Sequence, residues 1–154
     1  MAATKSFRNL YVVLGDQLDL QSSFFDEFDK TKDIVWMAEV LEESQRVWVH
    51  KARIVLFLSA MRHFAQTLEK EKIDLHYSEL DDAGNTQSLE GELVKTIKSC
   101  KPSRLIMTAP GDWRVLQKIK DVSSNYYSEN FWEKWQAGDE ACKAKIDAEL
   151  KRAG

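Results

Sequence analysis

Four short apolar runs alternate along the chain with stretches of helical periodicity, and this alternation restricts the fold more than any other feature. The runs are Leu10–Leu14, Asp33–Ala38, Ile73–Leu80 and Arg104–Thr108. The first two are apolar almost throughout, as in strands buried on both faces, whereas the third alternates in part and is expected at an edge. The pattern predicts an α/β, Rossmann-like fold: a mostly parallel sheet of four to five strands with helices on both faces.

The segments between these runs carry helix signals. The expected helices follow Ser22, span Val47 to about Glu69, run from Ser88 to Lys101, and follow Asp112. Serine and aspartate are residue types that cap the first turn of a helix by accepting a backbone N–H. The longest apolar stretch, around Ile54–Ala60, is far too short to span a bilayer and predicts a helix buried on much of its girth.

The end of the chain differs from the rest and suggests a second unit. We expect residues 1–122 to form the α/β domain and residues 123–154 to form a linker and an aromatic-rich helical tail. Ser123–Asn125 resembles a linker, and five aromatic residues lie within residues 126–135. Exposed aromatic side chains favour self-association, so the tail is expected to pack on the domain or on a partner, such as a second copy in a homodimer.

Composition narrows the class of protein. The 154 residues suffice for a well-buried core, and the net charge of −3 gives no general attraction to nucleic acid. The two cysteines are too few for a disulfide framework or a four-cysteine metal site, which favours the reducing cytoplasm. The amino-terminal residues have no apolar segment typical of a signal peptide, and no membrane association is expected.

Polar residues follow the expected strands at the point where each strand ends. They are Asp16 and Gln17 after Gly15, Glu39 and Glu43, Asp81 and Asp82, and Asp112 with Trp113. The carboxyl ends of parallel strands meet at one edge of a sheet, where ligands bind in this class of fold. Carboxylates that accept N–H groups and an indole for stacking suit a small planar ligand with polar edges. The alternative is that these acids cap helices and lie in solvated loops.

No pattern in the sequence indicates catalysis. The chain has no glycine-rich dinucleotide motif, no P-loop and no nucleophile elbow, and no two of its three histidines have the spacing of zinc ligands. Lys51, Arg53, Arg62 and His63 form a basic face on the long helix, which is more simply a solvated face.

Several longer motifs are more specific. They are GDQL at Gly15–Leu18, AEV at Ala38–Val40, HKARI at His50–Ile54, LSAMRHFAQTL at Leu58–Leu68, LDDAGNTQSLEGEL at Leu80–Leu93 and APGDWRVL at Ala109–Leu116. In this order and spacing they resemble the amino-terminal α/β domain of the deoxyribodipyrimidine photolyase-related proteins. These are bacterial (6-4) photolyases and cryptochromes, a DNA-repair-related family that carries an iron–sulfur cluster.

The resemblance implies that repair and chromophore binding belong to different domains. In that family a separate carboxyl-terminal helical domain holds FAD, the cluster cysteines and the DNA lesion, whereas the α/β domain holds an antenna chromophore, 6,7-dimethyl-8-ribityllumazine. By resemblance, Gly15, Asp16 and Gln17 would contact the chromophore, with Glu39 and Glu43 near it. With two cysteines the chain cannot build an iron–sulfur cluster, and we expect no photolyase activity from these residues alone.

The expected function is therefore that of a non-catalytic module that binds a lumazine, a flavin or a nucleotide-like ligand. Two alternatives remain: a ligand-free interaction or dimerisation module, and one subunit of a split photolyase completed by a helical flavoprotein. A small enzyme acting at the acidic edge is the least supported, because no nucleophile is paired with a base.

Overall fold

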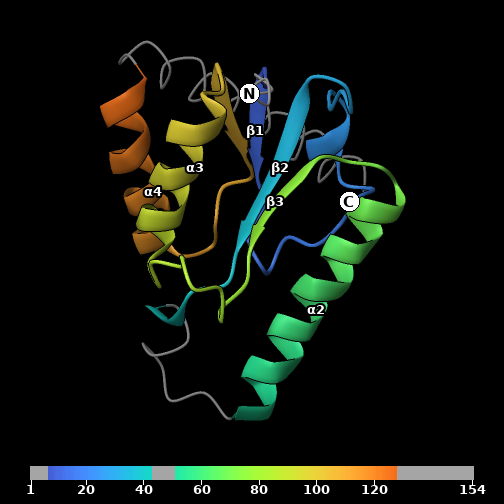
Figure 1. Ribbon diagram of the computed structural model, residues 1–154, viewed down its shortest axis with the longest axis vertical. Coiled ribbons are helices and arrows are strands. Elements are labelled where there is room, and N and C mark those ends of the chain that lie inside the picture. The colour runs from blue at the N-terminus through green and yellow to red at the C-terminus, as the bar shows by residue number, and fades with distance from the viewer. Residues whose placement is uncertain (1–6, 43–50, 128–154) are drawn as a thin grey trace, which may run out of the picture. The chain divides into compact units, whose positions relative to one another are not determined.

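The computed structural model describes residues 7–42 and 51–127. Its elements, drawn in Figure 1, are β1 (Asn9–Val12), a 3-10 turn η1 (Ser23–Phe25), β2 (Asp33–Ala38), α2 (Lys51–Lys70), β3 (Leu75–Ser78), α3 (Leu89–Cys100), β4 (Arg104–Met107) and α4 (Trp113–Tyr126). All four expected strands are confirmed, and so are the caps at Ser22 and Ser88, whose hydroxyl oxygens accept N–H groups from Phe24 and Gly91.

The four strands form one parallel sheet in the order β3-β2-β1-β4. Leu10 of β1 lies opposite Ile34 of β2 and Leu105 of β4, and Trp36 of β2 lies opposite His76 of β3. β3 lies at an edge, as its partial alternation predicted. Because every strand runs the same way, the loops that leave the strands meet at a single edge of the sheet.

The core forms on both faces of this sheet. Tyr11, Val13, Val35 and Met37 point to one face and pack against Met61, Phe64 and Leu68 of α2. Trp36 points to the other face, where its indole N–H donates to the hydroxyl of Thr96 in α3 at 3.0 Å. Figure 1 shows α2 on one side of the strands and α3 on the other, so the α/β architecture with helices on both faces is confirmed.

The bond from Trp36 to Thr96 gives a prediction about stability. Thr96→Val keeps the shape of a fully buried side chain but leaves the indole N–H without an acceptor, which costs about 1 kcal/mol. Thr67→Val is the matched control, because both threonines donate to the carbonyl four residues earlier and Thr67 is exposed. Urea unfolding should show a loss only for Thr96→Val; equal losses would assign the cost to the helix bond instead.

The expectation that α2 is buried on much of its girth is wrong for its first half. Val55, Leu56 and Phe57 are 63%, 71% and 44% exposed, whereas the buried positions start at Met61. A 20-residue helix is about 30 Å long, whereas strands of four to six residues span about 13–20 Å. The first half of α2 therefore extends past the ends of the strands, as Figure 1 shows, and has no sheet to pack on.

The expected linker at Ser123–Asn125 is also wrong, because α4 continues through it to Tyr126. Serine and asparagine cost less than about 1 kcal/mol each in a helix, and the segment has no glycine or proline to end it. The division at residues 122 and 123 remains a prediction, and residues 128–154 of the expected tail lie outside the described residues. Within residues 7–42 and 51–127, no helix combines the length and the apolar character that crossing a membrane requires.

Candidate functional site

The loops that follow β1, β2 and β4, together with the middle of α2, border a partly open cavity of about 220 Å³. Its walls are mainly apolar and include Val13, Trp36, Leu58 and Met61. It lies at the carboxyl end of the strands, where the sequence predicted a ligand site. The loop after β3, with Asp81 and Asp82, does not contribute to the lining.

The structure places four of the seven expected site residues around this cavity: Gly15, Asp16, Glu39 and Asp112. Gln17 does not line it, and its amide donates instead to the carbonyl of Thr108 at 3.3 Å, which ties the loop after β1 to the end of β4. Glu43 lies outside the described residues.

Trp113, the expected stacking partner, lies outside the cavity. Its side chain is 66% exposed, and the ammonium of Lys120 lies 5.5 Å from the centre of its ring. The aromatic side chains that do line the cavity are Trp36 and Phe57. Their role could not be predicted from the sequence, because both belong to apolar stretches that pattern alone assigns to the core.

Gly15 lies in close contact with side chains of α2. No glycine among the described residues has a positive φ, so Gly15 does not serve a left-handed turn. A Cβ at this position would lie 2.3 Å from Cζ of Phe57 and 2.9 Å from Sδ of Met61. The glycine therefore lets α2 approach the loop after β1 closely, and this contact shapes one wall of the cavity.

Two of the lining carboxylates differ in their partners. Asp112 accepts from the backbone N–H of Arg114 at 2.8 Å and from its guanidinium at 2.8 Å, so it caps α4 as the sequence predicted. Asp16 is exposed and has no hydrogen bond or ion pair to any other residue that the structure describes. Its carboxylate is thus available to accept a donor from a ligand.

Glu39 has a fully buried carboxylate whose acceptor sites are filled by the protein. Its oxygens accept Nε and Nη2 of Arg62 at 2.9 Å each, the N–H of Leu80 at 2.9 Å and the hydroxyl of Tyr77. A carboxylate offers about four lone-pair sites, so none is left for the ligand N–H that we expected it to accept. Any contact of Glu39 with a ligand is left to its other atoms.

These contacts set the ionisation of the cluster. Burial works to raise the pKa of Glu39, but the hydrogen bonds from Arg62, Tyr77 and Leu80 outweigh it, so the pKa lies below its ordinary value. Burial and the bond to Glu39 raise the pKa of Tyr77. Arg62 was expected on a solvated basic face, but it pairs with the buried carboxylate of Glu39. The spacing of the two residues in the sequence does not reveal this pairing.

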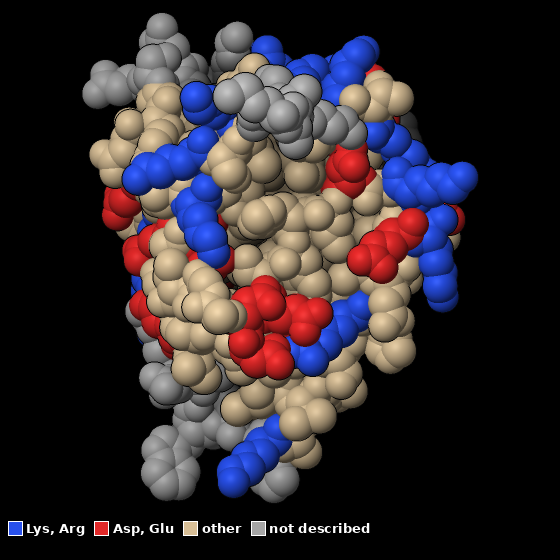
Figure 2. Space-filling model, in the orientation of Figure 1, with Lys and Arg blue, Asp and Glu red and all other residues tan. Residues whose placement is uncertain are grey.

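The surface beside the cavity carries charges of both signs. Arg62 also lies 3.6 Å from carboxylate oxygens of Glu79 and Asp81. The acidic residues after β3 therefore lie next to a guanidinium that is already paired with Glu39. Figure 2 shows Lys and Arg side chains near the margin of this face and a group of acidic residues in its lower half, without a continuous basic surface. Within the described ranges, no three His, Cys, Asp or Glu side chains gather as metal ligands do.

Comparison with known proteins identifies the family. The model of the deoxyribodipyrimidine photo-lyase-related protein family matches residues 11–137. A (6-4) photolyase from Agrobacterium fabrum (strain C58 / ATCC 33970) is 42% identical over 110 residues, which cover 71% of this chain and 22% of that protein. The chain therefore spans about a fifth of the length of this relative. The resemblance drawn from the motifs is confirmed, and the chain belongs to the deoxyribodipyrimidine photo-lyase-related protein family.

Proposed function

We propose that this chain is a non-catalytic α/β module that binds a small planar chromophore of the lumazine or flavin type. The observation that carries the proposal is the cavity at the carboxyl end of the sheet, with mainly apolar walls and the carboxylate of Asp16, which pairs with no other residue in the described part of the chain. Apolar walls favour burial of a ring, and Asp16 would accept the N–H group of the ring or a ribityl hydroxyl. The name of the relative describes a photolyase, but repair activity belongs to a protein of which this chain matches 22%.

The size of the cavity restricts which ring system it can hold. Its volume of about 220 Å³ is below the roughly 300–1,000 Å³ of pockets that enclose a drug-sized molecule. It therefore suits the bicyclic ring of 6,7-dimethyl-8-ribityllumazine with the ribityl chain outside, better than the tricyclic ring of a flavin. Our proposal is that the lumazine binds more tightly than riboflavin.

Fluorescence titration with 6,7-dimethyl-8-ribityllumazine and with riboflavin tests this function, using two matched variants. Leu58→Glu puts a charge into an apolar wall and should weaken lumazine binding by about tenfold or more. Leu56→Glu makes the same change on the same helix at a side chain that is 71% exposed and outside the lining, and should leave Kd within about twofold. Absence of binding by the unaltered protein, or equal loss in both variants, would remove the proposal.

A second candidate function is an interaction module, either a homodimer or one subunit of a split photolyase-like flavoprotein. The observation that favours it is the exposed apolar surface of Val55, Leu56 and Phe57 on α2. Sedimentation of the purified protein, alone and with a helical flavoprotein of the family, separates these readings. In either assembly Leu56→Glu should dissociate the complex. A protein that sediments as a monomer and does not bind the flavoprotein would exclude both the homodimer and the split photolyase.

A further inference from the structure

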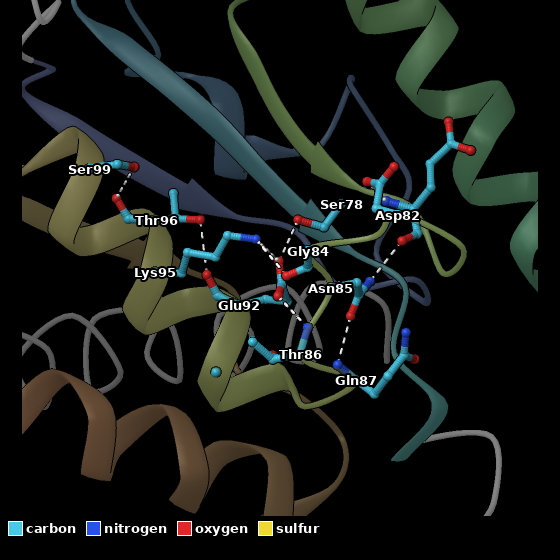
Figure 3. Close-up of polar contacts among 12 residues, drawn as sticks. Ser78, Asp82, Gly84, Asn85, Thr86, Gln87, Glu92, Lys95, Thr96 and Ser99 are labelled. Carbon is cyan, nitrogen blue, oxygen red and sulfur yellow. Dashed lines mark hydrogen bonds and ion pairs between the residues drawn. The ribbon is translucent and has the colours of Figure 1, made fainter.

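The loop Glu79–Ser88 after β3 contains most of the distinctive LDDAGNTQSLEGEL motif. No residue of this loop lines the cavity, although Leu89, the next residue, does. The side chains of Asp82 and Asn85, drawn in Figure 3, bond to backbone groups of the same loop. The carboxylate of Asp82 accepts the N–H of Glu79 at 2.8 Å, and Oδ1 of Asn85 accepts the N–H of Gln87 at 2.7 Å. These bonds restrain the backbone of the loop.

α3 anchors the loop from one side. The fully buried carboxylate of Glu92 accepts the hydroxyl of Ser78 at 2.6 Å and the N–H of Thr86 at 2.7 Å. Burial works to raise the pKa of Glu92, but these bonds outweigh it and hold the pKa below its ordinary value. Gly91 permits this packing, because a Cβ there would lie 2.4 Å from Oγ1 of Thr86.

On its other side the loop holds the segment that leaves β2. Nδ2 of Asn85 donates to the carbonyl oxygens of Glu39 at 2.8 Å and of Glu79 at 2.7 Å. The N–H of Leu41 donates to Oε1 of Gln87 at 3.3 Å. To donate to two backbone carbonyl oxygens at once, a side-chain nitrogen must carry two N–H groups. Among the uncharged side chains, only the amides of Asn and Gln have such a nitrogen.

We propose that Asn85 is a positioning residue for the ligand cavity: it fixes Glu39–Leu41, and with it the wall that Glu39 and Val40 provide, without touching the ligand. The inference rests on the proposed function and explains why a motif outside the cavity is so elaborate. A wall held in place before binding spares the ligand the entropy of ordering it, so affinity depends on a residue remote from the ring.

The test uses Asn85→Asp, which turns a lone pair toward two carbonyl oxygens, and Asn85→Ser, which replaces the two N–H donors by one shorter hydroxyl without adding a charge. The control is Asp33→Asn at the opposite end of β2. Asp33 is also buried, and its carboxylate accepts four hydrogen bonds from Arg8, Asn9 and Asp29. The control therefore destabilises the domain away from the cavity.

Amide hydrogen exchange followed by NMR gives the first readout. In both Asn85 variants the amides of Val40 and Leu41 should exchange at least about tenfold faster relative to the amide of Val12 in β1. In Asp33→Asn the three amides should accelerate by the same factor. Titration with the lumazine gives the second readout, with Kd raised about tenfold by Asn85→Asp and changed less than about twofold by the control.

The outcomes separate the two proposals. If the unaltered protein binds no lumazine or flavin, the proposed function fails, and the exchange comparison alone still decides the role of Asn85. If Val40 and Leu41 accelerate no more than Val12 in the Asn85 variants, the positioning role is overturned, whatever the ligand affinity. If the protein binds lumazine and Asn85→Asp leaves Kd unchanged, the inference is overturned as well.

Discussion

Arg62→Met is expected to lower the free energy of unfolding by about 3 kcal/mol at pH 7. The variant leaves the fully buried carboxylate of Glu39 charged, with two of its four acceptor sites unfilled. Removing one partner of a buried ion pair costs about 3–5 kcal/mol, and the lower end applies because the Arg62 side chain is 43% exposed. Tyr77 and Leu80 remain as donors and limit the loss further.

The loss should depend on pH in a defined direction. The bonds to Glu39 lower its pKa in the folded protein, so its contribution is complete above the unfolded-state pKa of about 4.3 and is lost as pH falls through the lower folded-state value. Without Arg62, only Tyr77 and Leu80 still offset the effect of burial, so the folded-state pKa of Glu39 rises. Protonation of Glu39 then reduces the destabilisation of the variant. The difference between the two proteins should therefore be largest at neutral pH and shrink below about pH 4.5.

Urea unfolding at pH 7 and pH 4 measures this difference, with Lys30→Met as the control. Lys30 pairs with Glu71 at 3.2 Å, and both side chains are at least half exposed, at 50% and 59%. Exposed pairs contribute about 0–1 kcal/mol, so the control should change stability little at either pH. A loss for Arg62→Met that is the same at pH 7 and pH 4 would show that the cost arises from packing of its aliphatic chain and not from the charge of Glu39.

The fold was predictable because its signals are local. A short, fully apolar run such as Leu10–Leu14 fits a strand buried on both faces, and the partial alternation in Ile73–Leu80 fits an edge strand. The identity of the strands and the edge position of β3 therefore followed from pattern. The caps at Ser88 and Asp112 followed from residue type. The position of the cavity followed from the parallel sheet alone.

The parts that failed depend on lengths and partners that pattern does not contain. The apolar residues around Leu56 look buried in a helical wheel, but only the length of the strands shows that the sheet ends before them. Glu39 follows a strand as a ligand-binding acid would, yet Arg62 lies 23 residues away and takes its carboxylate. Asn85 and Glu92 lie in a loop and a helix whose polar composition is typical of solvent exposure, although Glu92 is fully buried.

Gly15→Val is expected to lower the free energy of unfolding by about 2 kcal/mol, within the range for overpacking, because the half-exposed ring of Phe57 can move away only in part. The new Cβ would meet the ring of Phe57 at 2.3–2.5 Å, well inside contact distance, and the branched γ-methyl groups add to the overlap. The backbone of Gly15 is not in the left-handed region, so no conformational strain contributes. The whole cost therefore arises from side chains of α2, chiefly Phe57.

Because the destabilisation by Gly15→Val arises mainly from Phe57, truncating Phe57 should remove most of it. Phe57→Ala clears the space that the new side chain needs, and Phe57 is 44% exposed, so its own truncation should cost less than a buried Phe→Ala change, which costs about 3–5 kcal/mol. In the Phe57→Ala background Gly15→Val should cost less than about 1 kcal/mol, which gives a coupling energy of about 1–2 kcal/mol between the two positions. Urea unfolding of the four proteins closes this cycle. A cost that is equal in both backgrounds would place the strain in the loop itself and would separate the shape of the cavity wall from the contact between Gly15 and Phe57.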